Sequence, residues 1–152
     1  MMKPIYIPFI ALTFCTGFAQ ENQKIYDIID AVSSKSIKQD IEKLVSFGTR
    51  HTLSDTLSKS RGIGAARRWI KSEFDKISDT CDGCLEVFYQ KNYFTPEDGD
   101  RIVKPVWINN VVAIQRGTTH PNRFIIMSGD IDSRISDPTN YTDDSPGAND
   151  NA

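Results

Sequence analysis

Carboxylates follow an apolar run near the end of the chain. The run Phe124–Met127 leads through Ser-Gly to Asp130 and Asp132, spaced Asp-x-Asp, and a later loop supplies Asp150. Carboxylates just past a buried strand are costly to gather unless a positive charge lies among them, and a divalent metal ion commonly supplies it. Alternate side chains of an extended chain point the same way, so Asp130 and Asp132 can converge on one point. Gly147 lets the backbone approach closely, so that Asp150 can reach the same point.

The two motifs resemble those of the M28 family of zinc aminopeptidases and carboxypeptidases. In that family a strand ends in His-x-Asp, and a Gly-Ala-Asn-Asp-Asn-Ala-Ser-Gly loop carries the aspartate that bridges two zinc ions. The stretches here are Ile125-Ile-Met-Ser-Gly-Asp-Ile-Asp-Ser-Arg134 and Ser145-Pro-Gly-Ala-Asn-Asp-Asn-Ala152. The resemblance implies that Asp150 is the bridging metal ligand and that Asp130 takes the position of the first histidine ligand. It also matches Asp132 to the aspartate that orients this histidine as its outer-shell partner, so Asp132 is the expected catalytic residue.

The same resemblance implies an exopeptidase that hydrolyses peptide bonds in peptide or protein substrates. An aminopeptidase is expected over a carboxypeptidase on family frequency alone. Two divalent ions, ordinarily zinc, would share the bridging carboxylate, polarise the scissile carbonyl and lower the pKa of a bridging water. The alternative comes from a different class: a non-catalytic relative that keeps the fold for binding or stability.

An aspartate at position 130 changes the chemistry expected of this site. Asp130 has no N–H to give to Asp132, so the two carboxylates repel unless a metal, a proton or a cation such as Arg134 intervenes. An oxygen ligand in place of nitrogen also hardens the site, which would admit manganese or another hard cation beside zinc. Asp-x-Asp alone is weak evidence, since Asp-rich loops such as Asp137–Asp144 are commonly solvated turns. The Gly-Ala-Asn-Asp-Asn-Ala run that follows is the more specific signal.

The N-terminus has the order of a secretory signal peptide. Met1-Met-Lys3 is positive, Ile5–Phe14 is almost continuously apolar, and Gly17 and Ala19 are small residues before a cleavage site at Gln20. We therefore expect residues 1–19 to be removed and the protein to be exported, to the periplasm or outside the cell. The apolar run is shorter than the roughly 20 residues of a membrane-spanning helix.

Two cysteines remain after this cleavage, in Cys81-Asp-Gly-Cys84. Close spacing in an oxidising compartment favours a disulfide over half of a zinc site or a redox pair. A zinc site is less favoured because the two histidines, His51 and His120, lack ligand spacing. A redox pair is less favoured because the cysteines precede a predicted strand, whereas a redox pair lies at the start of a helix. We expect His51 to have a surface or packing role and Arg50 to be structural.

Helical periodicity dominates the first half of the chain. Apolar spacing predicts helices over 23–32, from a capping box at Ser36 to Gly48, and over 62–77. On the last of these, Arg67 is expected to face water, and the stretch 48–57 between helices is expected to be a polar loop.

The second half predicts sheet. Strand-type residues fill 85–94, a second strand lies within 106–114 and begins near Asn110, and 124–127 is apolar enough for a central strand buried on both faces. This order predicts an α/β protein. By resemblance it is a three-layer α/β/α sandwich with a mixed central sheet, of the phosphorylase/hydrolase-like kind.

Residues 20–152 are accordingly expected to form the N-terminal part of an M28-like catalytic domain. Family members need a Glu-Glu pair, a further Asp and a last His beyond the matching region, so this chain alone is expected to be inactive and poorly folded. The formal charge of −2 and the absence of a basic stripe give no indication of nucleic-acid binding.

Overall fold

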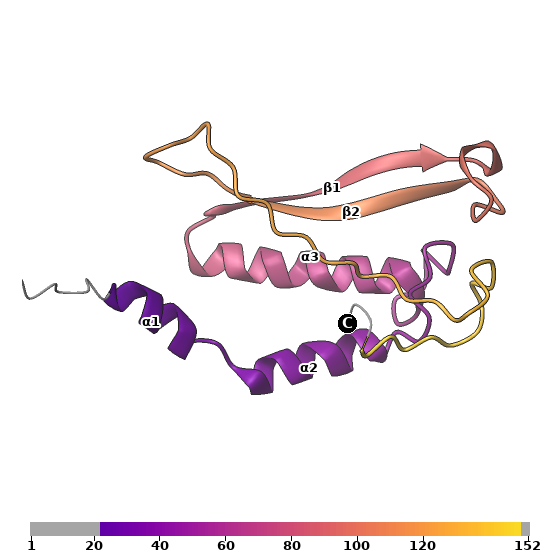
Figure 1. Cartoon of the computed structure of the whole chain (residues 1–152), viewed down its shortest axis with the longest axis horizontal. Coiled ribbons are helices and arrows are strands. Elements are labelled where there is room, and N and C mark those ends of the chain that lie inside the picture. The colour runs from indigo at the N-terminus through magenta and orange to yellow at the C-terminus, as the bar shows by residue number, and fades with distance from the viewer. Residues whose placement is uncertain (1–21, 150–152) are drawn as a thin grey trace, which may run out of the picture. The chain divides into compact units, whose positions relative to one another are not determined.

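The computed structural model describes residues 22–149, which divide into two compact units between Ser33 and Ser34 (Figure 1). The predicted signal peptide lies outside the described residues. The first unit contributes helix α1, Gln23–Asp30, in which the side chain of Asn22 accepts a hydrogen bond from the N–H of Lys24 at 3.2 Å. This helix was predicted from its apolar spacing, and its apolar residues Ile25 and Ile28 are exposed.

The second unit begins with two helices. Helix α2 spans Ser34–Val45 and begins two residues before the predicted capping box, and helix α3 spans Gly62–Thr80. Gly48 has a φ of +69°, which glycine adopts without steric cost, and it lies beyond the end of α2. The buried core joins the two helices: Phe47 packs against Ala65 and Ala66, with Trp69 beside them. Both predicted helices are therefore confirmed, with shifted ends.

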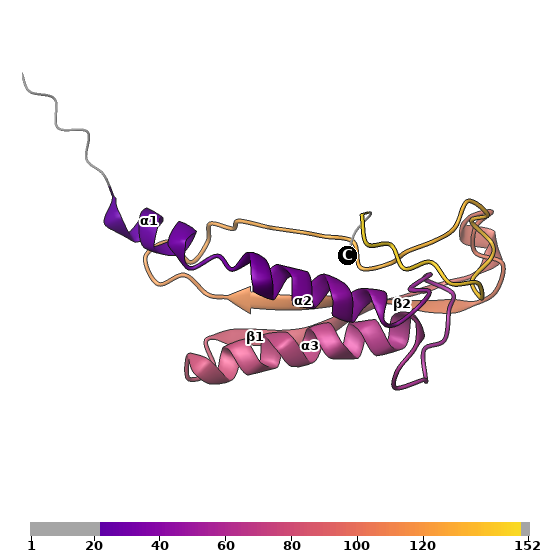
Figure 2. The ribbon, with the colours of Figure 1, turned by 90° about the horizontal axis from the view of Figure 1, so that it is seen from below.

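A two-stranded antiparallel sheet packs on α3 (Figure 2). Strand β1, Leu85–Phe94, pairs with β2, Val106–Gln115, and the register places Leu85 opposite Gln115 and Phe94 opposite Val106. The second strand begins at Val106 rather than near Asn110. A 3₁₀ helix, η1, at Pro96–Asp98 turns the chain between the strands, with a Thr95 capping box. The prediction of an α/β protein is confirmed at the level of mixed helix and sheet.

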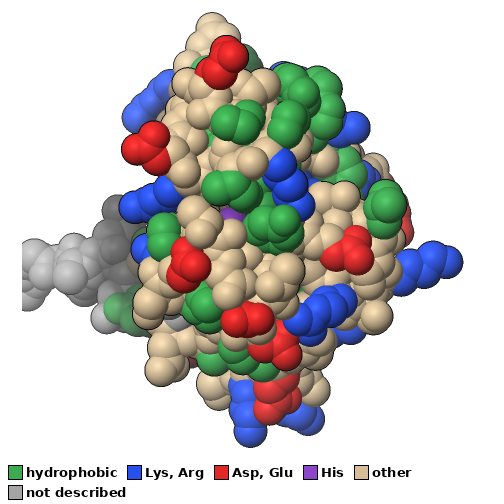
Figure 3. All heavy atoms as spheres, turned by 90° about the vertical axis from the view of Figure 1, so that its right-hand side faces the viewer, with side chains coloured by type: hydrophobic (Ala, Val, Ile, Leu, Met, Phe, Trp, Pro, Cys, Tyr) green, Lys and Arg blue, Asp and Glu red, His purple; other side chains and the backbone are tan. Residues whose placement is uncertain are grey.

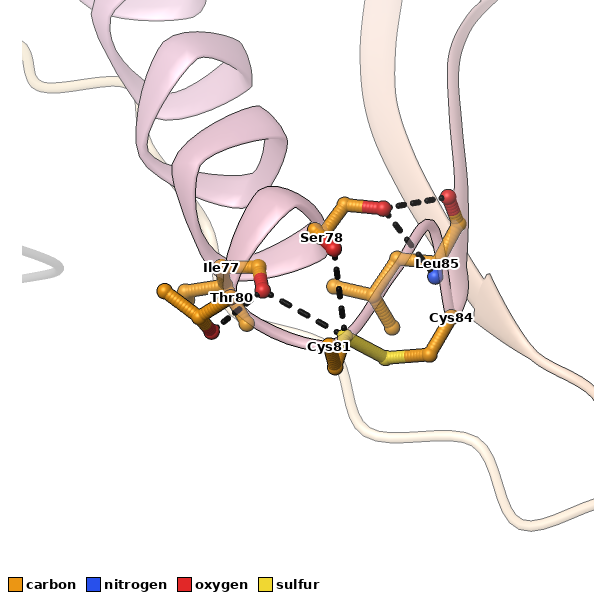
Figure 4. Close-up of a disulfide and its surroundings, with 6 residues drawn as sticks. All are labelled: Ile77, Ser78, Thr80, Cys81, Cys84 and Leu85. Atoms are coloured by element: carbon orange, nitrogen blue, oxygen red, sulfur yellow. Dashed lines mark hydrogen bonds between the residues drawn. A yellow bond between two sulfur atoms is a disulfide. The ribbon is translucent and has the colours of Figure 1, made fainter.

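A disulfide fixes the connection from α3 to β1 (Figure 4). Cys81 and Cys84 are bonded, with their Cα atoms 5.4 Å apart, as their spacing predicted. The hydroxyl of Ser78 donates to the carbonyl of Leu85 at 3.0 Å and accepts from its N–H at 3.2 Å. The end of α3 and the start of β1 are thus joined by both a covalent bond and hydrogen bonds.

The prediction of a central strand at 124–127 is wrong for this structure. Residues 123–135 form neither helix nor strand, and the side chains of Phe124 to Met127 are 81–94% exposed. A strand buried on both faces requires a neighbour on each side, and the sheet in residues 22–149 consists of β1 and β2 alone. No helix in this range has the length and hydropathy required to cross a bilayer.

Candidate functional site

The predicted site residues lie on the extended C-terminal segment. Asp130 is exposed and Asp132 is half-buried, and neither follows a formed strand. Asp150 lies outside the described residues, but Pro146 and Gly147, which precede it, are described. The question for the site is therefore whether the two segments that carry these aspartates lie together.

Both segments meet the loop between α2 and α3, which is unexpectedly buried. The prediction of a polar loop over 48–57 is correct for its conformation and wrong for its environment, because its first half lies in the interior of the unit. Its buried residues are Thr49, Arg50, His51, Leu53 and Ser54. Polar side chains can be buried here because each finds a hydrogen-bond partner.

Arg50 connects this loop to both predicted motifs. Its side chain is 0% exposed. Its Nε donates to the carbonyl of Ile131 at 2.8 Å, and its Nη1 donates to the carbonyls of Pro146 at 2.6 Å and Leu44 at 3.0 Å. Nη2 makes a longer contact of 3.5 Å to the carbonyl of Gly147. Ile131 stands between Asp130 and Asp132, so one guanidinium touches the Asp-x-Asp segment and the loop that leads to Asp150.

A serine makes a second link between the same segments. The hydroxyl of Ser133 accepts a hydrogen bond from the backbone N–H of Arg50 at 3.0 Å and donates to the carbonyl of Ser145. Ser133 and Ser145 are both buried. The structure thus brings the Asp130–Asp132 segment and the Ser145–Gly147 segment together through side-chain bonds.

Arg50, rather than Arg134, is the cation whose charge interacts with that of Asp132. Burial lowers the pKa of Arg50 from its ordinary value, and the negative charge of Asp132 opposes this shift. The guanidinium nevertheless stays charged at neutral pH. Thr52 adds a long contact of 3.5 Å from its hydroxyl to a carboxylate oxygen of Asp132. Arg134, the cation considered from the sequence, is exposed and contacts the carbonyl of Ile135.

His51 does not offer a free nitrogen to a metal. Its Nδ1 accepts from the backbone N–H of Leu53 at 3.0 Å, and its Nε2 lies 3.0 Å from the carbonyl of Pro138. Since a carbonyl only accepts, Nε2 carries the proton and the ring is the neutral tautomer. The packing role expected of His51 agrees with these contacts.

Arg61, at the start of α3, also binds the C-terminal segment. Arg61 forms an ion pair with Asp144 at 2.5 Å and donates to the carbonyl of Thr142 at 3.2 Å. Figure 3 views the molecule from this end, where acidic and basic side chains lie around apolar ones. These surface pairs are individually weak, so the buried contacts of Arg50 and Ser133 carry the connection.

Two of the three predicted aspartates lie within the described residues. Asp130 and Asp132 supply carboxylate oxygens, which zinc accepts and which manganese prefers. Within residues 22–149 no three His, Cys, Asp or Glu side chains are grouped to hold a metal ion. Asp150, the other predicted ligand, lies outside this range.

A separate cavity of about 340 Å³ lies on another side of the buried loop. It is lined by residues of that loop, of α3 and of the hairpin, including Leu53, Arg67, Lys104 and Trp107, and it includes none of the predicted aspartates. Arg67 was expected to face water but is only 6% exposed. Burial lowers the pKa of Arg67 from its ordinary value. Tyr89 opposes this shift, and the positive charge of Arg68 adds to it. The periodicity of α3 could not reveal this, because the surface that covers Arg67 comes from other segments.

The chain is similar over most of its length to fungal proteins named probable zinc metalloproteases. It is 47% identical over 125 residues to one from Pyrenophora teres f. teres, covering 82% of this chain and 26% of that protein. It is 45% identical over 130 residues to one from Leptosphaeria maculans, covering 86% and 30%. A third, from Phaeosphaeria nodorum, is 40% identical over 127 residues, covering 84% and 26%.

The chain therefore spans about a quarter to a third of the length of these relatives. No family model matches the chain, and no solved structure matches it. The likeness to zinc metalloproteases thus rests on sequence identity over most of this chain.

Proposed function

We propose that this chain is part of an exported zinc-dependent exopeptidase of the M28 type, with aminopeptidase activity on peptides or proteins. The observation that carries the proposal is the placement of the two motifs: Arg50 binds the carbonyl of Ile131 at 2.8 Å and that of Pro146 at 2.6 Å. One guanidinium thus holds the two segments close together, as a shared metal site would require. The names of the relatives support the choice of metal and of reaction class.

In this proposal Asp130 and Asp150 hold the metal, and Asp132 orients the site from the outer shell. The charge of Arg50 opposite Asp132 supports this division, since Asp132 already has a cationic neighbour in the protein. When bound, a pair of divalent ions would polarise the scissile carbonyl and lower the pKa of water, so that hydroxide is available at neutral pH. The general base and further ligands belong to residues beyond those described.

The proposal also includes the fold of the complete domain. We propose that Phe124–Met127 becomes a strand of a three-layer α/β/α sandwich once neighbouring strands are present. Its present exposure of 81–94% supports this, because such an apolar stretch ordinarily lies in a protein interior. Export is proposed from the N-terminal pattern, and sequencing the mature N-terminus tests it: Gln20 is the expected first residue.

The test of function is metal content and peptidase activity of the complete protein expressed with its disulfide. We expect about two zinc ions per chain and hydrolysis of amino-acid nitroanilides that chelation abolishes. Asp130→Asn should lower zinc affinity by at least about a hundredfold, more than the loss of an outer-shell partner costs. Asp143→Asn, in the exposed loop nearby, is the matched control and should change neither quantity. A protein that folds, binds no zinc and hydrolyses no peptide would instead be the non-catalytic relative.

A further inference from the structure

The least exposed large side chain among residues 22–149 belongs to Arg50, and its contacts are selective. Its guanidinium donates to main-chain oxygens of α2, of the Asp-x-Asp segment and of the loop before Asp150, at Leu44, Ile131 and Pro146. Main-chain acceptors fix where a segment runs, whereas side-chain acceptors could move on their own rotamers. The contacts of Arg50 therefore determine backbone positions.

Burying a guanidinium is unfavourable, so the arrangement requires compensation. Three hydrogen bonds of 3.0 Å or less supply part of it, and the charge of Asp132 supplies more. The planar fork of arginine is what lets one side chain meet carbonyls from three segments. Lysine has a single nitrogen and could not span the same acceptors.

We infer that Arg50 is a positioning residue that holds the Asp130–Asp132 segment and the Ser145–Gly147 segment at a fixed separation, which the proposed metal site requires. This inference rests on the proposed function. Ser133 acts in the same direction, because its hydroxyl joins the N–H of Arg50 to the carbonyl of Ser145. Neither residue touches the metal or the substrate.

The test measures zinc affinity by chelator competition in the complete protein, for wild type, Arg50→Lys and Arg67→Met. Arg67 is the matched control, because it is also buried, yet no described hydrogen bond joins it to either segment. We expect Arg50→Lys to weaken zinc binding about ten- to hundredfold, the range for outer-shell partners of metal sites. Arg67→Met should leave zinc affinity unchanged even where it lowers the thermal midpoint by a similar amount.

Limited proteolysis of the metal-free protein provides a readout that does not depend on zinc. Arg50→Lys should accelerate cleavage within residues 131–147, while Arg67→Met should not. If Arg50→Lys does not fold, Ser133→Ala provides the same comparison with a smaller expected effect, since it removes one link and leaves Arg50 in place.

The outcomes separate the two proposals. Wild-type protein that binds no zinc refutes the proposed function and with it the positioning role. Wild-type protein that binds zinc, combined with Arg50→Lys of equal affinity, refutes only the positioning role. An equal loss of affinity in Arg67→Met would also overturn it, because general destabilisation would then explain the result.

Discussion

At the scale of single residues, the site is organised by polar groups that are buried and satisfied. His51 uses both ring nitrogens, one toward Leu53 and one toward Pro138. The turn that presents Pro138 is itself held by Asp137, whose carboxylate accepts from the N–H of Thr139 at 2.8 Å and from its hydroxyl at 2.7 Å. A surface carboxylate thereby supports the placement of a buried imidazole.

This arrangement predicts a specific acid sensitivity. The hydrogen bond from the N–H of Thr139 lowers the pKa of Asp137 most, and the hydrogen bond from the Thr139 hydroxyl lowers it further. Because the folded pKa lies below the ordinary value of 3.8, the stabilisation is complete above that pH and is lost as pH falls through the lower folded pKa. Asp137→Asn keeps an acceptor for Thr139 but does not titrate. We expect thermal midpoints measured from pH 5 down to pH 2 to fall less steeply for this variant.

Asp79→Asn, at an exposed position on α3, controls for the loss of one negative charge. An unchanged acid dependence in Asp137→Asn, or an equal flattening in Asp79→Asn, would contradict the role given to Asp137.

At the scale of elements, the loop after α2 docks on the first turn of α3. The N-cap residue of α3 is Arg61, and its side chain makes no capping hydrogen bond. Instead the hydroxyl of Ser54 accepts from the N–H of Ile63 at 2.9 Å, and the carbonyl of Asp55 accepts from the N–H of Gly64 at 3.1 Å. The loop thus satisfies N–H groups that a helix start leaves open, and it holds Arg50 in place at its other end.

This docking requires glycine at position 64. A Cβ on Gly64 would lie 2.2 Å from the carbonyl oxygen of Thr56, and the obstacle is backbone, so it cannot rotate away. We expect Gly64→Ala to destabilise the protein by about 3 kcal/mol, the upper end of ordinary overpacking costs. The free energy of unfolding in urea measures this effect. Gly99→Ala is the control, because nothing lies within 4 Å of a Cβ there; similar losses in both variants would contradict the argument.

Local patterns in the sequence predicted the helices and the hairpin because their periodicity and turn residues lie within each element. They did not predict the burial of Thr49 to Ser54, since that loop has no apolar period. The acceptors of Arg50 at Ile131 and Pro146 are 81 and 96 residues away in sequence, so no local signal connects them. The prediction that Arg67 faces water was wrong for a related reason, because the residues that cover it come from other segments of the chain. The Cys81–Cys84 disulfide was predictable because close spacing, in the oxidising compartment expected after export, favours the bond.

At the scale of the whole molecule, the most exposed run of consecutive apolar residues among 22–149 is Phe124–Met127. Phe124, Ile125, Ile126 and Met127 are 81%, 94%, 87% and 93% exposed, and the structure gives this stretch no strand partner within residues 22–149. Consecutive apolar residues with open backbone groups resemble an unprotected edge strand. In the proposed sandwich the same residues would be interior, so their exposure is a property of the 152-residue chain considered alone.

The 152-residue chain is therefore expected to self-associate through this stretch, because extended apolar segments pair with one another when nothing else covers them. Sedimentation velocity across a range of concentrations measures this, and Ile126→Lys should shift the chain toward the monomer by placing a charge in the pairing face. Leu57→Lys is the matched control, since Leu57 is equally exposed, at 88%, but lies in a polar loop. A wild-type chain that stays monomeric, or a Leu57→Lys chain that dissociates as far as Ile126→Lys, would mean that 124–127 is not the associating surface. Dissociation by Ile126→Lys alone would identify this stretch as the associating surface.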